Sequence, residues 1–181
     1  LLGKPASETK VAFVPTAASV VADDKSWLIK DFQYFVNQGF KAIDIVDISA
    51  VPKENWQKRF EVADLLCFGG GDEQYLLKMM RESGVTERLP GLLSTRVYMG
   101  ISAGSMVAGK LLSNELTQEL WPEESFEGNE AGMGVFNFSI LPHLNSEYFA
   151  HLRAPLIESL ANRFSQTVYA LDDASALKIT D

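Results

Sequence analysis

The chain has very few of the side chains that hold metals or form disulfides. Its 181 residues include one cysteine and two histidines. A single cysteine excludes an intramolecular disulfide framework and fits a reducing compartment, so we expect a cytoplasmic protein. Two histidines and one cysteine also argue against a zinc site of the His/Cys kind. The sequence therefore predicts neither a metal nor another cofactor.

Long apolar segments and an excess of positive charge are missing as well. No apolar run approaches the roughly 18–20 residues of a membrane span, and residues 1–10 lack the pattern of a secretion signal. Lysine and arginine number 16 against 24 aspartates and glutamates, which gives a net charge of −8. Because binders of nucleic acids and anionic membranes usually present a basic patch, we expect neither kind of partner.

What is present suits one globular domain. Hydrophobic residues make up 46% of the chain, enough for a substantial core. We find no internal repeat and no linker, so we expect a single domain over residues 1–181. The sequence does not begin with methionine, and we expect a few residues to be missing at either end.

Strand and helix patterns alternate along the chain. Short apolar runs predict strands at 11–15, 42–46, 64–68, 97–101, 135–141, 167–171 and 175–179. Helices are expected from Asp23 or Asp24 to Gly39, over 52–59, after Asp72, over 102–112, and over 147–162, where Pro155 kinks the helix or opens a second one. Residues 113–134 have the composition of a long loop. This alternation predicts an α/β fold with a mostly parallel sheet, covered on both faces, whose ligands bind at the carboxyl ends of the strands.

The run Gly100-Ile101-Ser102-Ala103-Gly104 follows one expected strand and precedes a helix. It fits the nucleophile elbow G-x-S-x-G, in which small neighbours let a sharp turn lift the serine out of the sheet. The same turn aims the Ala103 amide at a developing oxyanion. The alternative is an ordinary strand-to-helix turn in which Ser102 only caps the helix. We favour Ser102 as the nucleophile of a hydrolase.

A second glycine-rich turn, Gly69-Gly70-Gly71, ends the strand before it. Backbone amides without side chains approach a ligand closely, so Gly70 and Gly71 are candidates for a second oxyanion donor. The turn lacks the spacing of a dinucleotide fingerprint and the lysine of a P-loop. Taken alone, it could equally be a turn that needs a positive φ.

A serine nucleophile needs a base, and only His143 and His151 are available. His143 follows Pro142 at the end of an expected strand, whereas His151 lies within an expected helix, so we favour His143.

Candidates for the acid that orients the imidazole are Glu115, Glu119, Glu123, Glu124, Glu127 and Glu130, and periodicity cannot choose among them. Asp172 and Asp173 either form a turn or line the site. We expect Cys67 to be a core thiol.

Three ordered motifs together resemble the serine peptidase family of aspartyl dipeptidase (dipeptidase E) and cyanophycinase. They are 68–72 (Phe-Gly-Gly-Gly-Asp), 100–104 and 141–143 (Leu-Pro-His), and residues 170–177 are similar to a late segment of that family. The resemblance implies a flavodoxin-like three-layer sandwich of the class I glutamine amidotransferase-like kind. It implies Ser102 as nucleophile, His143 as base, and the amides of Gly70 or Gly71 and of Ala103 as the oxyanion hole. In that family the catalytic acid follows the elbow helix, and Glu115 is the residue of this chain that matches it best.

We therefore expect a serine peptidase that hydrolyses short peptides without a cofactor. A homodimer is one possible assembly. Asp72 stands where the dipeptidase branch has asparagine, so specificity for an aspartyl residue is not carried over. One alternative is an esterase of the α/β-hydrolase type, although its histidine normally lies near the chain end. The other is an amidotransferase-like domain used for binding only.

Overall fold

The computed structural model describes residues 1–22, 24–122 and 131–180. The chain divides into two compact units, residues 1–105 and 106–181. The expectation of a single peptidase domain stays a prediction. No helix in the described ranges is long and apolar enough to cross a membrane.

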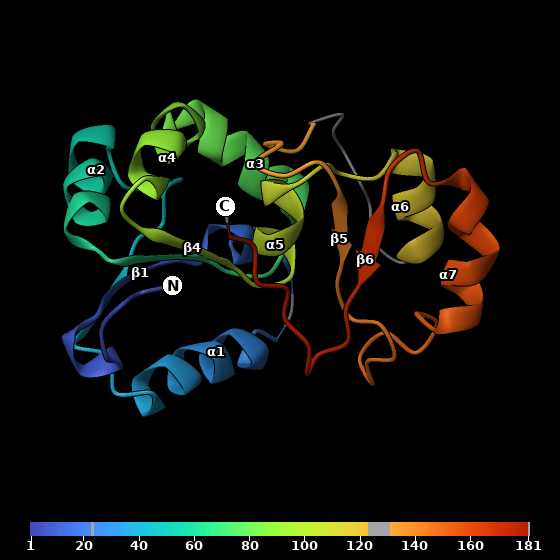
Figure 1. Cartoon of the computed structure of the whole chain (residues 1–181), viewed down its shortest axis with the longest axis horizontal. Coiled ribbons are helices and arrows are strands. Elements are labelled where there is room, and N and C mark those ends of the chain that lie inside the picture. Colours follow the sequence, from blue (N-terminus) through green and yellow to red (C-terminus); the bar gives the residue numbers. More distant parts are fainter. Residues whose placement is uncertain (23, 123–130, 181) are drawn as a thin grey trace. The chain divides into compact units, whose positions relative to one another are not determined.

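The first unit is built on a parallel sheet of four strands in the order β2-β1-β3-β4 (Figure 1). The strands are β1 (Lys10–Val14), β2 (Ala42–Ile45), β3 (Leu65–Phe68) and β4 (Val97–Gly100). All residues of β3 are buried, as the continuous apolar run typical of a central parallel strand predicts. All four expected strands of this sheet are confirmed, and they bring the ends of β3 and β4 side by side.

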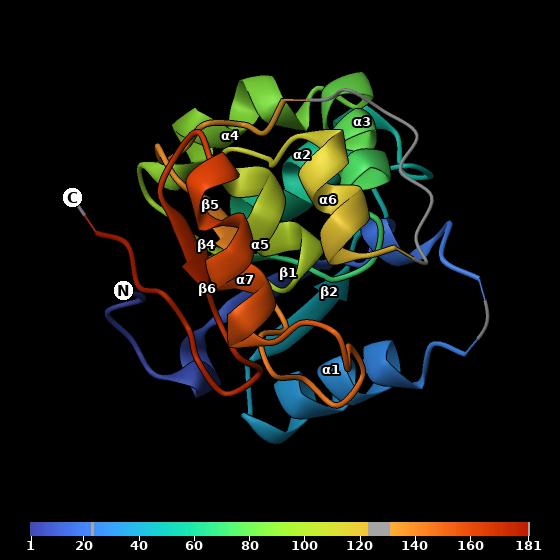
Figure 2. The same cartoon turned by 90° about the vertical axis from the view of Figure 1, so that its right-hand side faces the viewer.

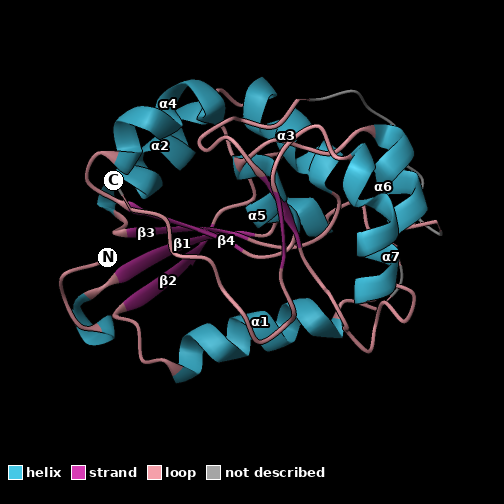
Figure 3. Ribbon diagram, turned by 45° about the vertical axis from the view of Figure 1, so that its right-hand side comes forward, coloured by secondary structure: helices cyan, strands magenta, loops and turns pink. Residues whose placement is uncertain are grey.

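Helices cover both faces of this sheet, with α1 on one face and α2, α3 and α4 on the other (Figure 3). Their bounds are α1 (Ser26–Asn37), α2 (Lys53–Val62), α3 (Glu73–Glu82) and α4 (Val85–Leu93). On one face, Phe35 of α1 meets Phe13 of β1 with ring centroids 5.4 Å apart. On the other, Phe60 of α2 meets Phe68 of β3 at 6.1 Å. The expected α/β architecture is therefore confirmed here.

Caps and glycines set the ends of these helices. Asp72 accepts a 2.7 Å hydrogen bond from the amide of Tyr75 and so caps α3 as predicted. Gly39, with φ of 70°, stops α1. Asp24 accepts from the amide of Ser26 at 3.1 Å, while the other candidate cap, Asp23, lies outside the described residues.

The second unit holds two parallel strands, β5 (Ser139–Leu141) and β6 (Val168–Ala170). Helices α6 (Asn114–Leu120) and α7 (Ala154–Leu160) belong to it, and α5 (Ala103–Ala108) leads into it along the chain. Figure 2 shows α6 and α7 next to each other. Leu120, Leu141 and Leu160 share its core.

Three sequence expectations are wrong in this unit. The expected loop contains the helix α6, because Ser113 accepts from the amide of Leu116 and caps it. The expected strand 175–179 is not a strand; these residues are exposed and pair with none of the described strands. Residues 147–153 of the expected helix 147–162 are not helical, whereas the alternative in which Pro155 opens a helix is confirmed, because α7 begins at Ala154 and Pro155 occupies its first turn, where its missing N–H costs nothing.

Candidate active site

Ser102 lies on a sharp turn between β4 and α5. Its backbone φ is 47°, in the left-handed region that residues with a side chain rarely adopt. The Ser102 carbonyl accepts from the Ser105 amide at 2.8 Å and from Ser105 Oγ at 2.6 Å, which closes the turn. The turn thus has the strained backbone that a nucleophile elbow uses to present its serine.

The glycines on either side of Ser102 are required by space. A Cβ on Gly100 would lie 2.4 Å from the amide nitrogen of Ser105, and one on Gly104 would lie 2.0 Å from the carbonyl oxygen of Phe68. Both distances are far shorter than real Cβ contacts. The expected need for small residues two positions before and two positions after Ser102 is therefore confirmed.

The glycine turn at 69–71 is joined directly to the elbow. The amide of Gly104 donates to the carbonyl of Gly69 at 3.2 Å. A Cβ on Gly70 would lie 3.3 Å from Cβ of Ser102 and 3.8 Å from its Oγ. The structure therefore brings Gly70 and Ser102 together at the carboxyl edge of the sheet, where the amides of Gly70, Gly71 and Ala103 are the candidate oxyanion donors.

Gly71 is held against the segment that follows β1. Its φ of 131° and a hypothetical Cβ only 2.2 Å from the carbonyl oxygen of Ala17 admit no other residue without movement. The amide of Asp72 donates to the same carbonyl at 3.0 Å. The short 3-10 turn Thr16–Ala18 thus fixes the glycine turn from behind.

Asp47 in turn fixes that 3-10 turn. Its Oδ1 accepts from Oγ1 of buried Thr16 at 2.8 Å and from Oγ of Ser49 at 2.7 Å. Partial burial alone would raise the pKa of Asp47, but the hydrogen bonds from Ser49, Thr16 and Ser19 outweigh it and hold the pKa below the ordinary value. These contacts position the glycine turn without touching Ser102.

In the second unit, His143 pairs with Asp173. Nδ1 of His143 lies 2.8 Å from Oδ1 of Asp173, and the imidazole packs on Phe149 with ring centroids 4.6 Å apart. His143 has φ of 68°, again left-handed. The amide of Leu171 donates to the carbonyl of Leu141, so the segments carrying the two residues leave the paired strands β5 and β6 together.

Asp173 is ionised more readily than an ordinary aspartate. Partial burial would raise its pKa, but hydrogen bonds from Ser146 and His143 lower it on balance. Ser146 is itself buried, at 4% exposure. A carboxylate held in this way is suited to orient an imidazole through its Nδ1–H and to stabilise the imidazolium.

The other candidates from the sequence lie in different surroundings. Glu115 is exposed in the first turn of α6, and Glu119 pairs with Arg163 at 2.6 Å. His151 Nε2 bonds the carbonyl of Leu120. Four further candidates lie outside the described residues: Glu123, Glu124, Glu127 and Glu130.

Cys67 is a core thiol, as predicted. It is buried in β3 at 0% exposure, and burial, together with the charge of Asp31, raises the pKa of its thiol. Among the described residues, no group of three or more His, Cys, Asp or Glu side chains could hold a metal ion.

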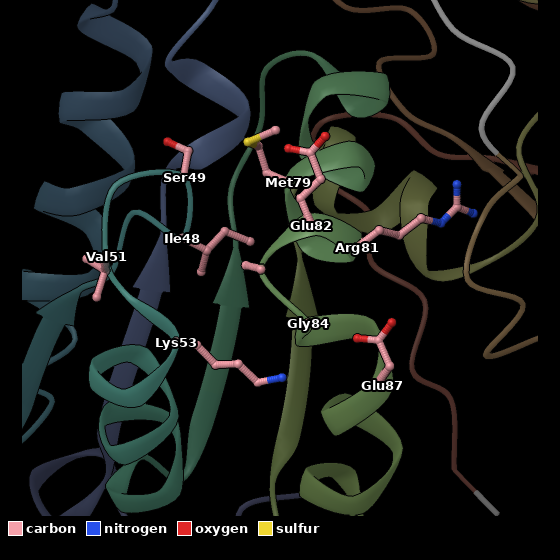
Figure 4. A pocket seen from close by; sticks show the side chains of 10 residues that line it. Ile48, Ser49, Val51, Lys53, Met79, Arg81, Glu82, Gly84 and Glu87 are labelled. Carbon is pink, nitrogen blue, oxygen red and sulfur yellow. The ribbon is translucent and has the colours of Figure 1, made fainter.

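A cavity of about 540 Å³ lies elsewhere in the first unit, lined by Lys53 of α2 and Glu87 of α4 among others (Figure 4). It shares no lining residue with the elbow or the glycine turn, and its charged side chains are of both signs. The strained backbone of Ser102 and its closeness to the glycine turn favour the elbow over this cavity as the candidate active site.

Asp173 was one of several acids left open by the sequence, and neither Ser146 nor Phe149 was predicted to lie beside His143. A signal for Asp173 was present, because His143 and Asp173 each come shortly after an expected strand. What the sequence does not reveal is that these two strands are neighbours in one parallel pair.

The known proteins that this chain resembles are peptidases. A model of peptidase family S51 matches residues 1–181. An uncharacterized peptidase of Listeria monocytogenes is 21% identical over 177 residues, which are 93% of this chain and 81% of that protein. Peptidase E of Actinobacillus pleuropneumoniae is 25% identical over 176 residues, 94% of this chain and 71% of its own length.

Solved structures show the same fold. A candidate peptidase E from Listeria monocytogenes superposes with a TM-score of 0.73 at 19% identity, covering 91% of this chain and 78% of that one. A peptidase from an acI-B1 actinobacterium superposes with a TM-score of 0.62 at 18% identity. The match covers 90% of this chain and 66% of that one. The expected flavodoxin-like α/β fold is therefore confirmed.

Proposed function

Since the chain belongs to peptidase family S51 and is a serine-type peptidase, we propose that it hydrolyses short peptides with Ser102 as nucleophile and His143 as base. The observation that carries the proposal is the strained turn at Ser102, with φ of 47° and Gly70 next to its side chain. Strain of this kind persists where the surrounding structure enforces it, and it gathers at active sites.

The reaction is acyl transfer to water. Ser102 Oγ attacks the peptide carbonyl carbon while its proton passes to Nε2 of His143. The oxyanion accepts hydrogen bonds from the amides of Gly70 or Gly71 and of Ala103. His143 then gives the proton to the leaving amine as the C–N bond breaks. A water molecule attacks the resulting ester, loses a proton to His143, and releases the carboxylic acid as the proton returns to Ser102.

We propose Asp173, in place of Glu115, as the third member of the site. Its carboxylate bonds Nδ1 of His143 at 2.8 Å, which presents the opposite nitrogen for proton transfer. Ser146 also hydrogen-bonds this carboxylate. Glu115 lies in the first turn of α6, whereas the acid of a triad is hydrogen-bonded to Nδ1 of its histidine, the atom that Asp173 contacts.

The test is hydrolysis of a panel of dipeptides and tripeptides by Ser102→Ala. We expect kcat/KM to fall by about a thousandfold or more, because no other group supplies the nucleophile. Ser94→Ala is the matched control, since it removes an exposed serine hydroxyl before β4, at the opposite end of that strand from Ser102, and should keep most of the activity. Full peptide hydrolysis by a folded Ser102→Ala variant would refute the proposal, and a wild-type protein that binds peptides without cleaving them would indicate a binding domain.

A further inference from the structure

An aromatic side chain stands beside the candidate nucleophile. A single carbon placed on Gly70 would contact Ser102 Cβ at 3.3 Å and Cζ3 of the Trp27 indole at 3.6 Å. The indole and Ser102 therefore flank the same glycine backbone, whose amide is a candidate oxyanion donor. A substrate whose carbonyl oxygen is held by that amide would extend its neighbouring atoms past the indole.

Trp27 is held in place by the helix that carries it. It lies in the first turn of α1, where Asp24 contacts the amide and the hydroxyl of Ser26. Five residues further along α1, Phe32 packs on Phe13 of β1 with ring centroids 4.6 Å apart. Trp27 itself is half-buried, so part of its ring meets solvent. A rigid helix thus presents a partly exposed aromatic surface next to the glycine turn.

The charge close to Trp27 disfavours an acidic ligand. Asp31, four residues later on α1, is on the same side of the helix. Burial raises the pKa of Asp31, and its negative charge also acts on Cys67 of β3 beneath it. An acidic substrate side chain placed on the indole would therefore lose water about one helical turn from a like charge. An apolar or aromatic side chain would lose only unfavourable contact with water.

We propose that Trp27 is a specificity-determining residue, the wall of a subsite that takes a large apolar or aromatic side chain on the carbonyl side of the cleaved bond. This inference rests on the proposed function of Ser102. It names the substrate class as peptides with phenylalanine, leucine or a similar residue at that position. The indole contributes contact area, and neither general acid nor base chemistry is required of it.

The test compares kcat/KM for peptides that differ only at that position, with phenylalanine, leucine, alanine or aspartate. Wild type should prefer phenylalanine to alanine by at least about tenfold, as pockets that bind large apolar groups do. Trp27→Ala should bring kcat/KM for the phenylalanine peptide down toward that for the alanine peptide, and Trp27→Phe should restore most of the difference. Tyr34→Ala is the control, since it removes an aromatic side chain of α1 that is 60% exposed.

A preference that Trp27→Ala leaves unchanged, or a wild-type preference for aspartate, would overturn the inference. Calorimetric binding of the same peptides to Ser102→Ala separates the two proposals. Binding that favours phenylalanine and depends on Trp27 supports the subsite even if wild type cleaves nothing, in which case only the proposed function fails. The absence of such binding overturns the subsite, whatever the rate of hydrolysis.

Discussion

At the scale of residues, two side chains with proposed chemical roles stand on left-handed backbone. Ser102 has φ of 47° and His143 has φ of 68°. Such conformations cost about 1–3 kcal/mol for residues with a side chain and persist only where their surroundings enforce them. At Ser102 the surroundings are two glycines with no room for a Cβ. At His143 they are the hydrogen bond to Asp173 and the packing on Phe149.

The identity of the acid gives a prediction at this scale. Asp173→Asn should lower kcat by about a thousandfold or more, because an amide favours the wrong imidazole tautomer. Glu115→Gln should have little effect. Steady-state hydrolysis of one good peptide by the two variants measures this directly. Equal losses, or a loss only in Glu115→Gln, would return the role to Glu115.

At the scale of elements, hydrogen bonds between the segment after β1 and the segment after β2 support the glycine turn. Asp47, just after β2, accepts hydrogen bonds from Thr16, Ser19 and Ser49, which lower its pKa below 3.8 despite partial burial. A lowered pKa means that ionised Asp47 stabilises the fold above its unfolded pKa. That contribution is lost as the pH falls through the folded value.

Asp47→Asn should therefore lower the free energy of unfolding at pH 7 by about 1 kcal/mol, since hydrogen bonds to a partly screened charge exceed neutral ones by about that much. The difference from wild type should shrink as the pH falls below about 4. Urea unfolding at pH 7 and pH 3 gives both values. Glu61→Gln, which removes an exposed ion pair with Arg88, is the control. A difference that stays constant with pH would contradict the assigned role of the charge.

Elements were predictable where burial leaves a clear pattern. The four strands of the sheet are short apolar runs, and β3 is buried throughout. Helix α6 was missed because seven residues carry too few apolar positions to show a period, although Leu116 and Leu120 are one turn apart. The segment 175–179 has the composition of a strand but remains exposed, because composition cannot supply a partner strand.

The turn that carries the candidate nucleophile could be predicted from the sequence, whereas the candidate acid could not be singled out. The elbow is local, so five consecutive residues carry its geometry. The contact between His143 and Asp173 depends on the pairing of β5 with β6, and Leu141 pairs with Ala170 there. Contacts of this kind follow from topology, which single-sequence patterns do not determine.

At the scale of the whole molecule, the net charge of −8 and the family bear on which ligands the protein meets. An acidic protein repels anionic ligands at long range, an effect that salt screens over about 10 Å. The acidic balance thus agrees with the proposed preference for apolar over acidic peptides. The family match over residues 1–181 shows a serine-type peptidase, while the residues that perform the reaction are our proposal.

The central claim is that Ser102 becomes covalently acylated during turnover. The direct measurement is acid quenching of the protein with an activated peptide ester, followed by mass spectrometry of its fragments. We predict an added acyl mass on the fragment containing Ser102 in wild type and in Ser94→Ala, and none in Ser102→Ala. Turnover by wild type with an adduct on another residue, or an adduct that persists in Ser102→Ala, would contradict the account.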